Sequence, residues 1–210
     1  MLAWAVERKL ITSNPTKGVK KVLPEKRERF LSTLEARTLL QAIAKLEHER
    51  AIAASHASIL RLLLFTGARK QEILGLQWRE IDFENRQIRL PRHRSKTGER
   101  TIHLNTLAIA ELARAPQASE FVFPNLKGGD GHTIGLHKTW RTVRAVAHLE
   151  DVRIHDLRHS FASFAAADGE SLYVIGKALG HRHAETTERY AHLADDPVRR
   201  LVEGVAKKLA

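Results

Sequence analysis

Residues 81–104 read IDFENRQIRLPRHRSKTGERTIHL and hold three short alternations of apolar and polar residues. The alternations lie at 81–83, 87–90 and 101–104, and they are joined by 84–86 and by a connection whose tip is 95–98. Alternation with a period of two is typical of strands that bury one face, and short connections favour antiparallel neighbours. We therefore predict a small three-stranded antiparallel sheet in this segment.

Helical periodicity dominates the sequence on both sides of this sheet. Apolar residues recur three or four positions apart, which places them on one face of a helix. A capping box of Ser32 and Glu35 is predicted to start the first long helix. The predicted helices are 33–46, 51–65, 106–113, 134–147, 156–167, 172–179, 184–194 and 197–209. The fold class is therefore mainly α with a small three-stranded antiparallel sheet.

The first 29 residues differ in character from the rest. Residues 2–10 predict one short helix that ends before Pro15, and 16–29 are rich in Lys and Arg and interrupted by Gly18 and Pro24. We interpret 1–29 as the end of an upstream domain followed by a basic linker. Residues 30–210 are expected to form the main domain.

Composition limits the function classes. The chain has 210 residues, 35 Lys and Arg against 24 Asp and Glu, a formal net charge of +11 and no Cys. The charge favours a polyanion such as nucleic acid, and the absence of Cys excludes disulfides, thiolate zinc sites and iron–sulfur clusters. Neither a membrane-spanning run nor a signal-peptide pattern is evident, so we expect a soluble, cytoplasmic chain without membrane contact.

Two segments place cations near turns. Arg69 and Glu72 lie three apart at the predicted start of a short helix after Gly67, where the carboxylate can orient the guanidinium for bidentate phosphate contact. A surface ion pair is the alternative. Lys96 lies at the tip of a basic hairpin and can reach a DNA groove or a leaving oxygen, with a solvated turn as the alternative.

Two further segments combine histidines with other functional groups. His155 and Arg158 lie three apart at the start of a predicted helix and can converge on one anion. His155 and His159 could instead ligate a metal, or serve as core residues, but no Cys and no acidic cluster supports the metal. His181 precedes Tyr190 by nine residues; a phenol becomes a useful nucleophile where cations stabilise it, and a half-buried structural Tyr is the alternative.

Taken together, these segments resemble the catalytic domain of the tyrosine recombinases, the phage integrase family, from about residue 29 onward. The resemblance rests on five motifs: Thr66-Gly67-Ala68-Arg69 with Glu72-Ile73, Leu76 and Trp78; Ser95-Lys96-Thr97-Gly98; His155-Asp156-Leu157-Arg158-His159; Leu179-Gly180-His181; and Arg189-Tyr190-Ala191-His192. The resemblance implies the tyrosine recombinase catalytic-domain fold. It also implies that 1–29 is the last helix and exit linker of the N-terminal core-binding domain.

The resemblance further implies how the site binds a phosphate. Arg69 and Arg158 would clamp the non-bridging oxygens of the scissile phosphate, and His155 and His181 would hydrogen-bond to it. Glu72 would brace this constellation. Fixed cations would then stabilise the charge that develops on the phosphorane.

The same resemblance implies a covalent mechanism. Tyr190 would attack the phosphorus, form a 3′-phosphotyrosyl link and release a 5′-hydroxyl. Lys96 would protonate the leaving oxygen, and His155 would exchange a proton with the phenol. Neither metal, cofactor nor ATP is implied.

The implied partner is double-stranded DNA in a bacterial or phage setting, associated with the nucleoid. A tetramer on DNA is expected, through packing of the helix at 197–209 on a neighbouring protomer, or this helix folds back on its own domain; without DNA we expect a monomer. Because half of the DNA clamp is absent from this sequence, weak and salt-sensitive binding is expected. The alternatives are nicking and resealing as in type IB topoisomerases, and a DNA-binding remnant without recombination.

Overall fold

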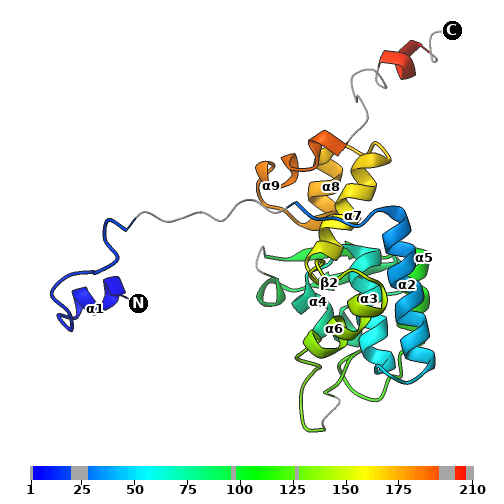
Figure 1. Ribbon diagram of the computed structural model, residues 1–210, viewed down its shortest axis with the longest axis horizontal. Helices are drawn as coiled ribbons and strands as arrows, with labels where there is room; N and C mark the ends of the chain where they lie inside the picture. Colours follow the sequence, from blue (N-terminus) through cyan, green and yellow to red (C-terminus); the bar gives the residue numbers. More distant parts are fainter. Residues whose placement is uncertain (1, 20–27, 96–97, 126–127, 194–201, 207–210) are drawn as a thin grey trace.

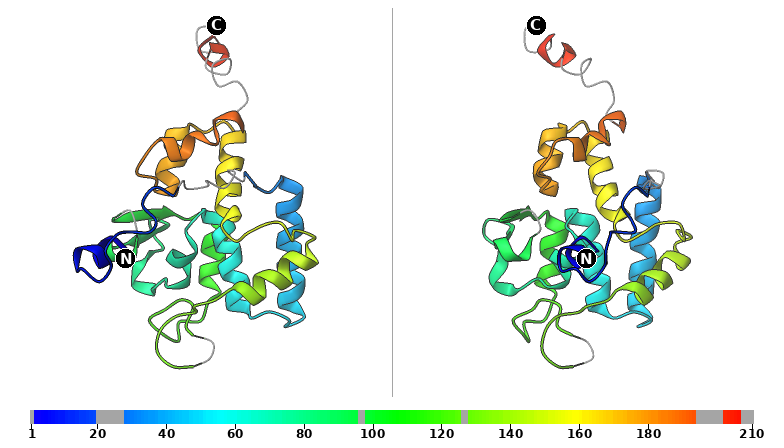
Figure 2. Two further views of the ribbon diagram at one scale, coloured as in Figure 1. Left: turned by 60° about the vertical axis from the view of Figure 1, so that its left-hand side comes forward. Right: turned by 90° about the vertical axis from the view of Figure 1, so that its left-hand side faces the viewer.

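The computed structural model describes residues 2–19, 28–95, 98–125, 128–193 and 202–206. Figures 1 and 2 show a main helical body with a smaller helical group at one end. The helices of the main body are α2 (Thr33–His48), α3 (Ala54–Thr66), α4 (Lys70–Leu74), α5 (Thr106–Ala113), α6 (His137–Val146) and α7 (Asp156–Ala167). The smaller group contains the end of α7, α8 (Leu172–Leu179) and α9 (Glu185–Glu188).

The predicted sheet is present. Strands β1 (Ile81–Asp82), β2 (Gln87–Leu90) and β3 (Arg100–His103) form one antiparallel sheet in the order β1-β2-β3. Ile88 pairs with Ile81 on one side and with Ile102 on the other, and Ile88 and Ile102 are buried. The short 3-10 helices η1 (Trp78–Glu80) and η2 (Arg92–Arg94) flank the strands. The alternation of apolar and polar residues thus correctly predicted a sheet that packs one face on the core.

Three predicted helices have the observed bounds, namely α5, α7 and α8. The helix predicted from residue 51 begins at Ala54, because Arg50 adopts a left-handed φ of 56° and residues 51 and 52 close a turn onto Leu46. The helix predicted from 134 begins at His137, because Thr133 is held by the carbonyl of Phe123. Helix α2 extends to His48 and begins with the predicted capping box of Ser32 and Glu35.

The continuous helix predicted over 184–194 is not observed. Helix α9 ends at Glu188, and a 3-10 helix η3 (Ala191–Leu193) follows. Between them the amide of Tyr190 donates to the carbonyl of Thr187, three residues earlier. This tighter turn carries Tyr190 inward, where its residue exposure is only 3%.

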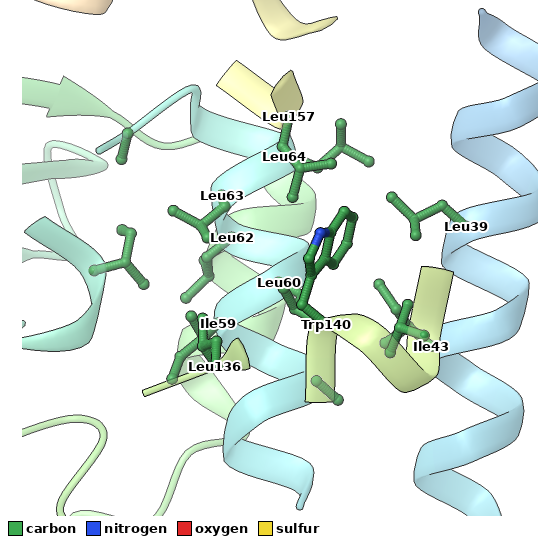
Figure 3. Close-up of a cluster of buried hydrophobic side chains, with 14 of the residues drawn as sticks. Leu39, Ile43, Ile59, Leu60, Leu62, Leu63, Leu64, Leu136, Trp140 and Leu157 are labelled. Carbon is green, nitrogen blue, oxygen red and sulfur yellow. The ribbon is translucent and has the colours of Figure 1, made fainter. Parts of the chain in front are cut away.

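The main core lies around α3 (Figure 3). Leu60, Leu62 and Leu63 of α3 are buried on several sides, since α2, α5 and α7 all pack against this helix. Trp140 of α6 inserts between α2 and α3, and its indole N–H donates to the carbonyl of Val152 at 3.1 Å. Burying such side chains stabilises the fold by about 1.5–3 kcal/mol each. This core fixes the ends of α3 and α7, both of which carry site residues.

The smaller group has its own apolar cluster. Ala162, Ala166, Ile175, Leu179 and Tyr190 form it, and they come from α7, α8 and the turn after α9. The aromatic ring of Tyr190 is therefore part of the packing that holds α8 against α7.

The two ends of the chain contribute little to this body. Helix α1 (Leu2–Glu7) is shorter than predicted and buries none of its residues, and it lies apart from the other helices in Figure 1. Most of the helix predicted at 197–209 lies outside the described residues; 202–206 are helical, with Val202 and Val205 exposed. Within the described part of the chain, every helix is too short or too polar to cross a membrane.

Candidate functional site

The turn between α3 and α4 positions Arg69 and Glu72. Gly67 ends α3 in the left-handed region with φ of 61°, and a Cβ there would lie 2.7 Å from the ring of Phe161. Only glycine suits both the φ and the close contact. The turn places Arg69 at the N-cap of α4, where its amide donates to Glu72 at 2.8 Å.

Glu72 is the centre of an ion-pair network. Its side chain is 3% exposed, and Arg69 Nη1 donates to its Oε1 at 2.9 Å. Arg100 of β3, itself buried, donates to the other carboxylate oxygen through Nη1. Arg69 and Glu72 are thus joined as predicted, while Arg100 was not among the predicted site residues. The signal for Arg100 was its place in the alternation of β3, where it shares the buried face with Ile102.

Arg158 enters the same region from the first turn of α7. Its residue exposure is 5%; Nη1 donates to the carbonyl of Gly67 and Nη2 to that of Leu179, each at 2.7 Å. These two bonds tie the end of α3 to the end of α8. They hold the guanidinium in a fixed orientation, which is a requirement for bidentate anion contact.

The C-terminal end of α8 gathers three arginines. Three successive carbonyls accept from them: Ala178 from Arg100 at 3.2 Å, Leu179 from Arg158 at 2.7 Å and Gly180 from Arg69 at 3.3 Å. The end of a helix leaves such carbonyls without intrahelical partners and carries partial negative charge, so it attracts cations. Helix α8 therefore assembles groups that are far apart in the sequence.

Positive charge exceeds negative charge in this cluster, because three guanidinium groups share the single carboxylate of Glu72. Burial, followed by the charges of Arg100 and Arg69, lowers the pKa of Arg158 to about 9. Burial lowers the pKa of Arg100 in the same way, against the opposing effect of Glu72. Burial alone would raise the pKa of Glu72, but Arg100 and Arg69 outweigh it and lower that pKa. A bound anion would relieve this excess.

His181 follows the α8 end directly. Its Nδ1 lies 2.8 Å from the hydroxyl of Thr187 in α9. Loss of solvent around the ring, followed by the charges of Arg158 and Arg69, lowers the pKa of His181 to about 4. The ring is therefore neutral at pH 7 and has one N–H to donate.

Tyr190 lies against a histidine of α7. Its hydroxyl is 2.5 Å from Nδ1 of His159, and His159 in turn packs edge-to-face on His155 with ring centroids 4.9 Å apart. The expected partner of the phenol was His155; the structure places His159 there instead, because residue 159 lies one helical turn further along the face of α7 that is turned toward Tyr190. Burial raises the pKa of Tyr190, while Arg189 and Arg158 partly oppose this rise.

The predicted site residues are thus largely brought together. Arg69, Glu72, Arg158 and His181 meet at the end of α8, and Tyr190 lies within electrostatic range of Arg158. His155 packs on His159 and lies within electrostatic range of Arg158 and Arg69, while Lys96 lies outside the described residues. In the described residues no three His, Asp or Glu side chains gather as a metal site would require.

Comparison with known proteins shows where this arrangement belongs. Residues 29–196 match the model of the phage integrase family. The chain belongs to the phage integrase family. Among its relatives, the tyrosine recombinase XerA of Saccharolobus solfataricus is 34% identical over 145 residues, and the tyrosine recombinase XerC of Mycobacterium tuberculosis is 30% identical over 207 residues.

Solved structures of other phage integrase family proteins share the fold. The catalytic domain of bacteriophage HP1 integrase matches with a TM-score of 0.63 and 23% identity, over 84% of this chain and 95% of that one. The XerH site-specific recombinase bound to difH substrate matches with a TM-score of 0.66 and 25% identity, over 89% of this chain and 56% of that one. The predicted fold, mainly α with a small sheet, is confirmed as that of tyrosine recombinase catalytic domains.

This phage integrase family chain matches part of its relatives' lengths. The matched stretch covers 67% of this chain and 47% of XerA, and 91% of this chain and 68% of XerC. The family assignment therefore applies to the matched residues 29–196.

Proposed function

We propose that this chain is the catalytic domain of a site-specific DNA recombinase, which cleaves and rejoins strands through a covalent link between Tyr190 and a 3′ phosphate. The observation that carries the proposal is the gathering of Arg69, Arg158 and His181 at the end of α8, within range of a buried phenol. Membership of the phage integrase family supports the same reaction class.

In this proposal the arginines bind the scissile phosphate. Arg69 and Arg158 contact its non-bridging oxygens, while Glu72 and Arg100 hold Arg69 in place. His181 donates a hydrogen bond from its neutral ring, and His155 donates a second from the edge of the site. The phosphorane carries more negative charge than the diester and therefore neutralises more of the excess positive charge of the cluster. The cluster thus stabilises the transition state more than the bound diester.

The chemical step then balances as follows. The Tyr190 oxygen forms a bond to phosphorus, the bond from phosphorus to the 5′ oxygen breaks, and the 5′ oxygen leaves with a proton from Lys96. The phenol proton passes to an imidazole; His159 is the ring in contact with it in the resting structure. Reversal by a 5′-hydroxyl of a second strand rejoins DNA without ATP.

The partner in this proposal is double-stranded DNA. XerH is described as bound to difH substrate, and a Tn1549 transposon integrase as bound to transposon right end DNA. On this chain a pocket beside α6 is lined by the cations Lys70, Lys138, Arg141, Arg144 and Arg153. Such a set suits contact with several backbone phosphates.

We also propose the domain division and the assembly. Residues 1–29 belong to an N-terminal unit and its linker, which is supported by the lack of buried residues in α1. The segment 197–209 packs on a neighbouring protomer in a DNA-bound tetramer, while the chain without DNA is a monomer. The exposed Val202 and Val205 suit such a contact.

Covalent trapping tests the function. A DNA duplex nicked next to the cleavage site loses its short 5′-hydroxyl fragment after attack, so the protein stays attached and migrates more slowly in a denaturing gel. Tyr190→Phe should abolish the adduct. Tyr173→Phe, at the exposed second tyrosine, should leave it unchanged. A binder without chemistry shifts DNA in a native gel and yields no adduct, and an adduct from Tyr190→Phe would refute the assigned nucleophile.

A further inference from the structure

Thr187 is a buried polar residue that the proposed reaction does not use. It lies in α9, three residues before Tyr190, and its residue exposure is 2%. Its hydroxyl is 2.8 Å from Nδ1 of His181. A buried hydroxyl in contact with one ring nitrogen can decide which nitrogen of that ring carries the proton.

Helix α8 is shaped to admit this hydroxyl. A Cβ added at Gly176 would lie 2.9 Å from Thr187 Oγ1, closer than real contacts of this kind allow. Gly176 is itself buried in the middle of α8, where glycine costs about 0.5–1 kcal/mol relative to alanine. The close approach between α8 and α9 therefore depends on a glycine that weakens the helix.

The direction of the hydrogen bond between Thr187 and His181 follows from which of the two groups has a proton to donate. In the described part of the chain, Nδ1 of His181 is the single group that hydrogen-bonds to the Thr187 hydroxyl. If Nδ1 carried the proton, it would donate to Oγ1 and leave the hydroxyl hydrogen buried without an acceptor, which costs about 1–3 kcal/mol. The favourable arrangement has the hydroxyl donating to Nδ1, with the ring proton on Nε2.

We propose that Thr187 is a positioning residue that holds His181 in the tautomer protonated at Nε2. In that tautomer a neutral ring can donate to a phosphate oxygen. With the other tautomer, Nε2 would present a lone pair to the anion and repel it. The consequence for phosphate binding rests on the proposed function, whereas the tautomer itself does not.

The same contact joins the nucleophile segment to the phosphate site. Thr187 lies in α9 and Tyr190 in the turn that follows it, so His181 keeps its contact with Thr187 when α9 packs on α8. The charges that lower the pKa of His181 are cationic: Arg158 of α7, Arg69 before α4, Arg100 of β3 and Arg189 after α9. The pockets that His181 lines also hold Lys177, Arg182 and the carboxylates of Glu99 and Glu188. The charges that lower this pKa disfavour an imidazolium, which makes the tautomer of the neutral ring decisive.

Nitrogen NMR of the protein without DNA tests the tautomer directly. With ¹⁵N-labelled histidine, His181 should show an unprotonated Nδ1 and a protonated Nε2 at pH 7. Thr187→Val should move both nitrogen shifts toward a mixture of tautomers, Thr187→Ser should keep the wild-type pattern, and Thr186→Val, at the exposed neighbouring threonine, should change neither. A protonated Nδ1 in the wild type, or unchanged shifts in Thr187→Val, would overturn the proposal.

The trapping rate tests the consequence. We expect Thr187→Val to form the covalent adduct about tenfold or more slowly at pH 8. The loss should be the same at pH 6 as at pH 8, because a ring with a pKa of about 4 is neutral at both pH values. Thr187→Ser should restore the rate, and a Thr187→Ser variant as slow as Thr187→Val would show that the hydroxyl does not act on the ring. If the NMR result holds while no variant forms an adduct, the proposed function fails and the tautomer assignment stands.

Discussion

The hydroxyl of Tyr190 lies 2.5 Å from Nδ1 of His159, and the two residues come from the turn after α9 and from α7. Burial, followed by the charge of the neighbouring His155, lowers the pKa of His159 to about 4, so its ring is neutral at pH 7 and can accept a hydrogen bond from the phenol when Nδ1 is unprotonated. The nucleophile of the proposed reaction is thus held protonated and hydrogen-bonded in the resting protein.

Removing the ring nitrogen at 159 should destabilise the fold. His159→Phe leaves the buried phenol without its hydrogen-bond partner, at a cost of about 1–3 kcal/mol in the free energy of unfolding. Urea unfolding of His159→Phe, Tyr190→Phe and the double variant measures the coupling, which we expect to be about 1 kcal/mol. Tyr173→Phe serves as the control. Strictly additive effects would show that the hydrogen bond contributes nothing.

Stability should fall as the pH drops from 6.5 toward 4.5. His159 and His181 have pKa values of about 4 in the folded protein, and an unfolded histidine titrates near about 6.5. Between these values the unfolded chain binds more protons, so their contribution is complete above pH 6.5 and is lost on acidification. The lowered pKa of Glu72 acts only below about pH 4.3.

Thermal unfolding between pH 7 and pH 4.5 measures this slope. The double variant His159→Gln, His181→Gln should flatten it. A slope equal to that of the wild type would mean that other groups cause the acid sensitivity.

Replacing the charged Glu72 side chain with a neutral one should strongly reduce the stability of the fold. Glu72→Gln leaves Arg69 and Arg100 without their buried counter-charge, and breaking a buried pair in this way costs about 3–5 kcal/mol. Asp82→Asn removes the partner of Arg89 in an exposed ion pair and should change the urea midpoint little. Equal midpoints for the two variants would contradict the central role of Glu72.

Gly180 should not tolerate a side chain. Its φ is 67°, and a Cβ would lie 2.7 Å from Nε of Arg100. Gly180→Ala therefore incurs the left-handed strain, about 1–2 kcal/mol, and also displaces Arg100. Gly128→Ala has a similar φ of 79° with no atom within 4 Å, so it reports the strain alone. The difference between their midpoints measures the crowding at Arg100, and no difference would place Arg100 elsewhere.

The sequence predicted helix bounds well where neighbouring residues alone determine them. The bounds of α5, α7 and α8 follow from apolar spacing, and the capping box at Ser32 predicted the start of α2. The prediction failed after Glu188, where the helical pattern is broken by a tight turn at Tyr190. Packing of the tyrosine ring against α7 and α8 outweighs the helical preference of those residues there.

The candidate site shows the same division. Arg69, Glu72, Arg158, His181 and Tyr190 were recognisable from motifs, because residue types and spacing carry that signal. Arg100 and His159 as the phenol's partner were not assigned, since each acts through a residue distant in the chain. Thr187 was not assigned either: His181 is only six residues away, but their contact depends on how α9 packs on α8. Arg100 reaches Glu72 over 28 positions and His159 reaches Tyr190 over 31.

The order of the residues alone therefore determined the helical class, the small sheet and the types of chemical group available. Only the tertiary structure decided which carbonyls hold the arginines, which imidazole meets the phenol and which hydroxyl meets His181. The physical reason is that spacing along a chain sets which side chains share a face, whereas hydrogen bonds and charge interactions act over a few ångströms between elements that packing alone brings together.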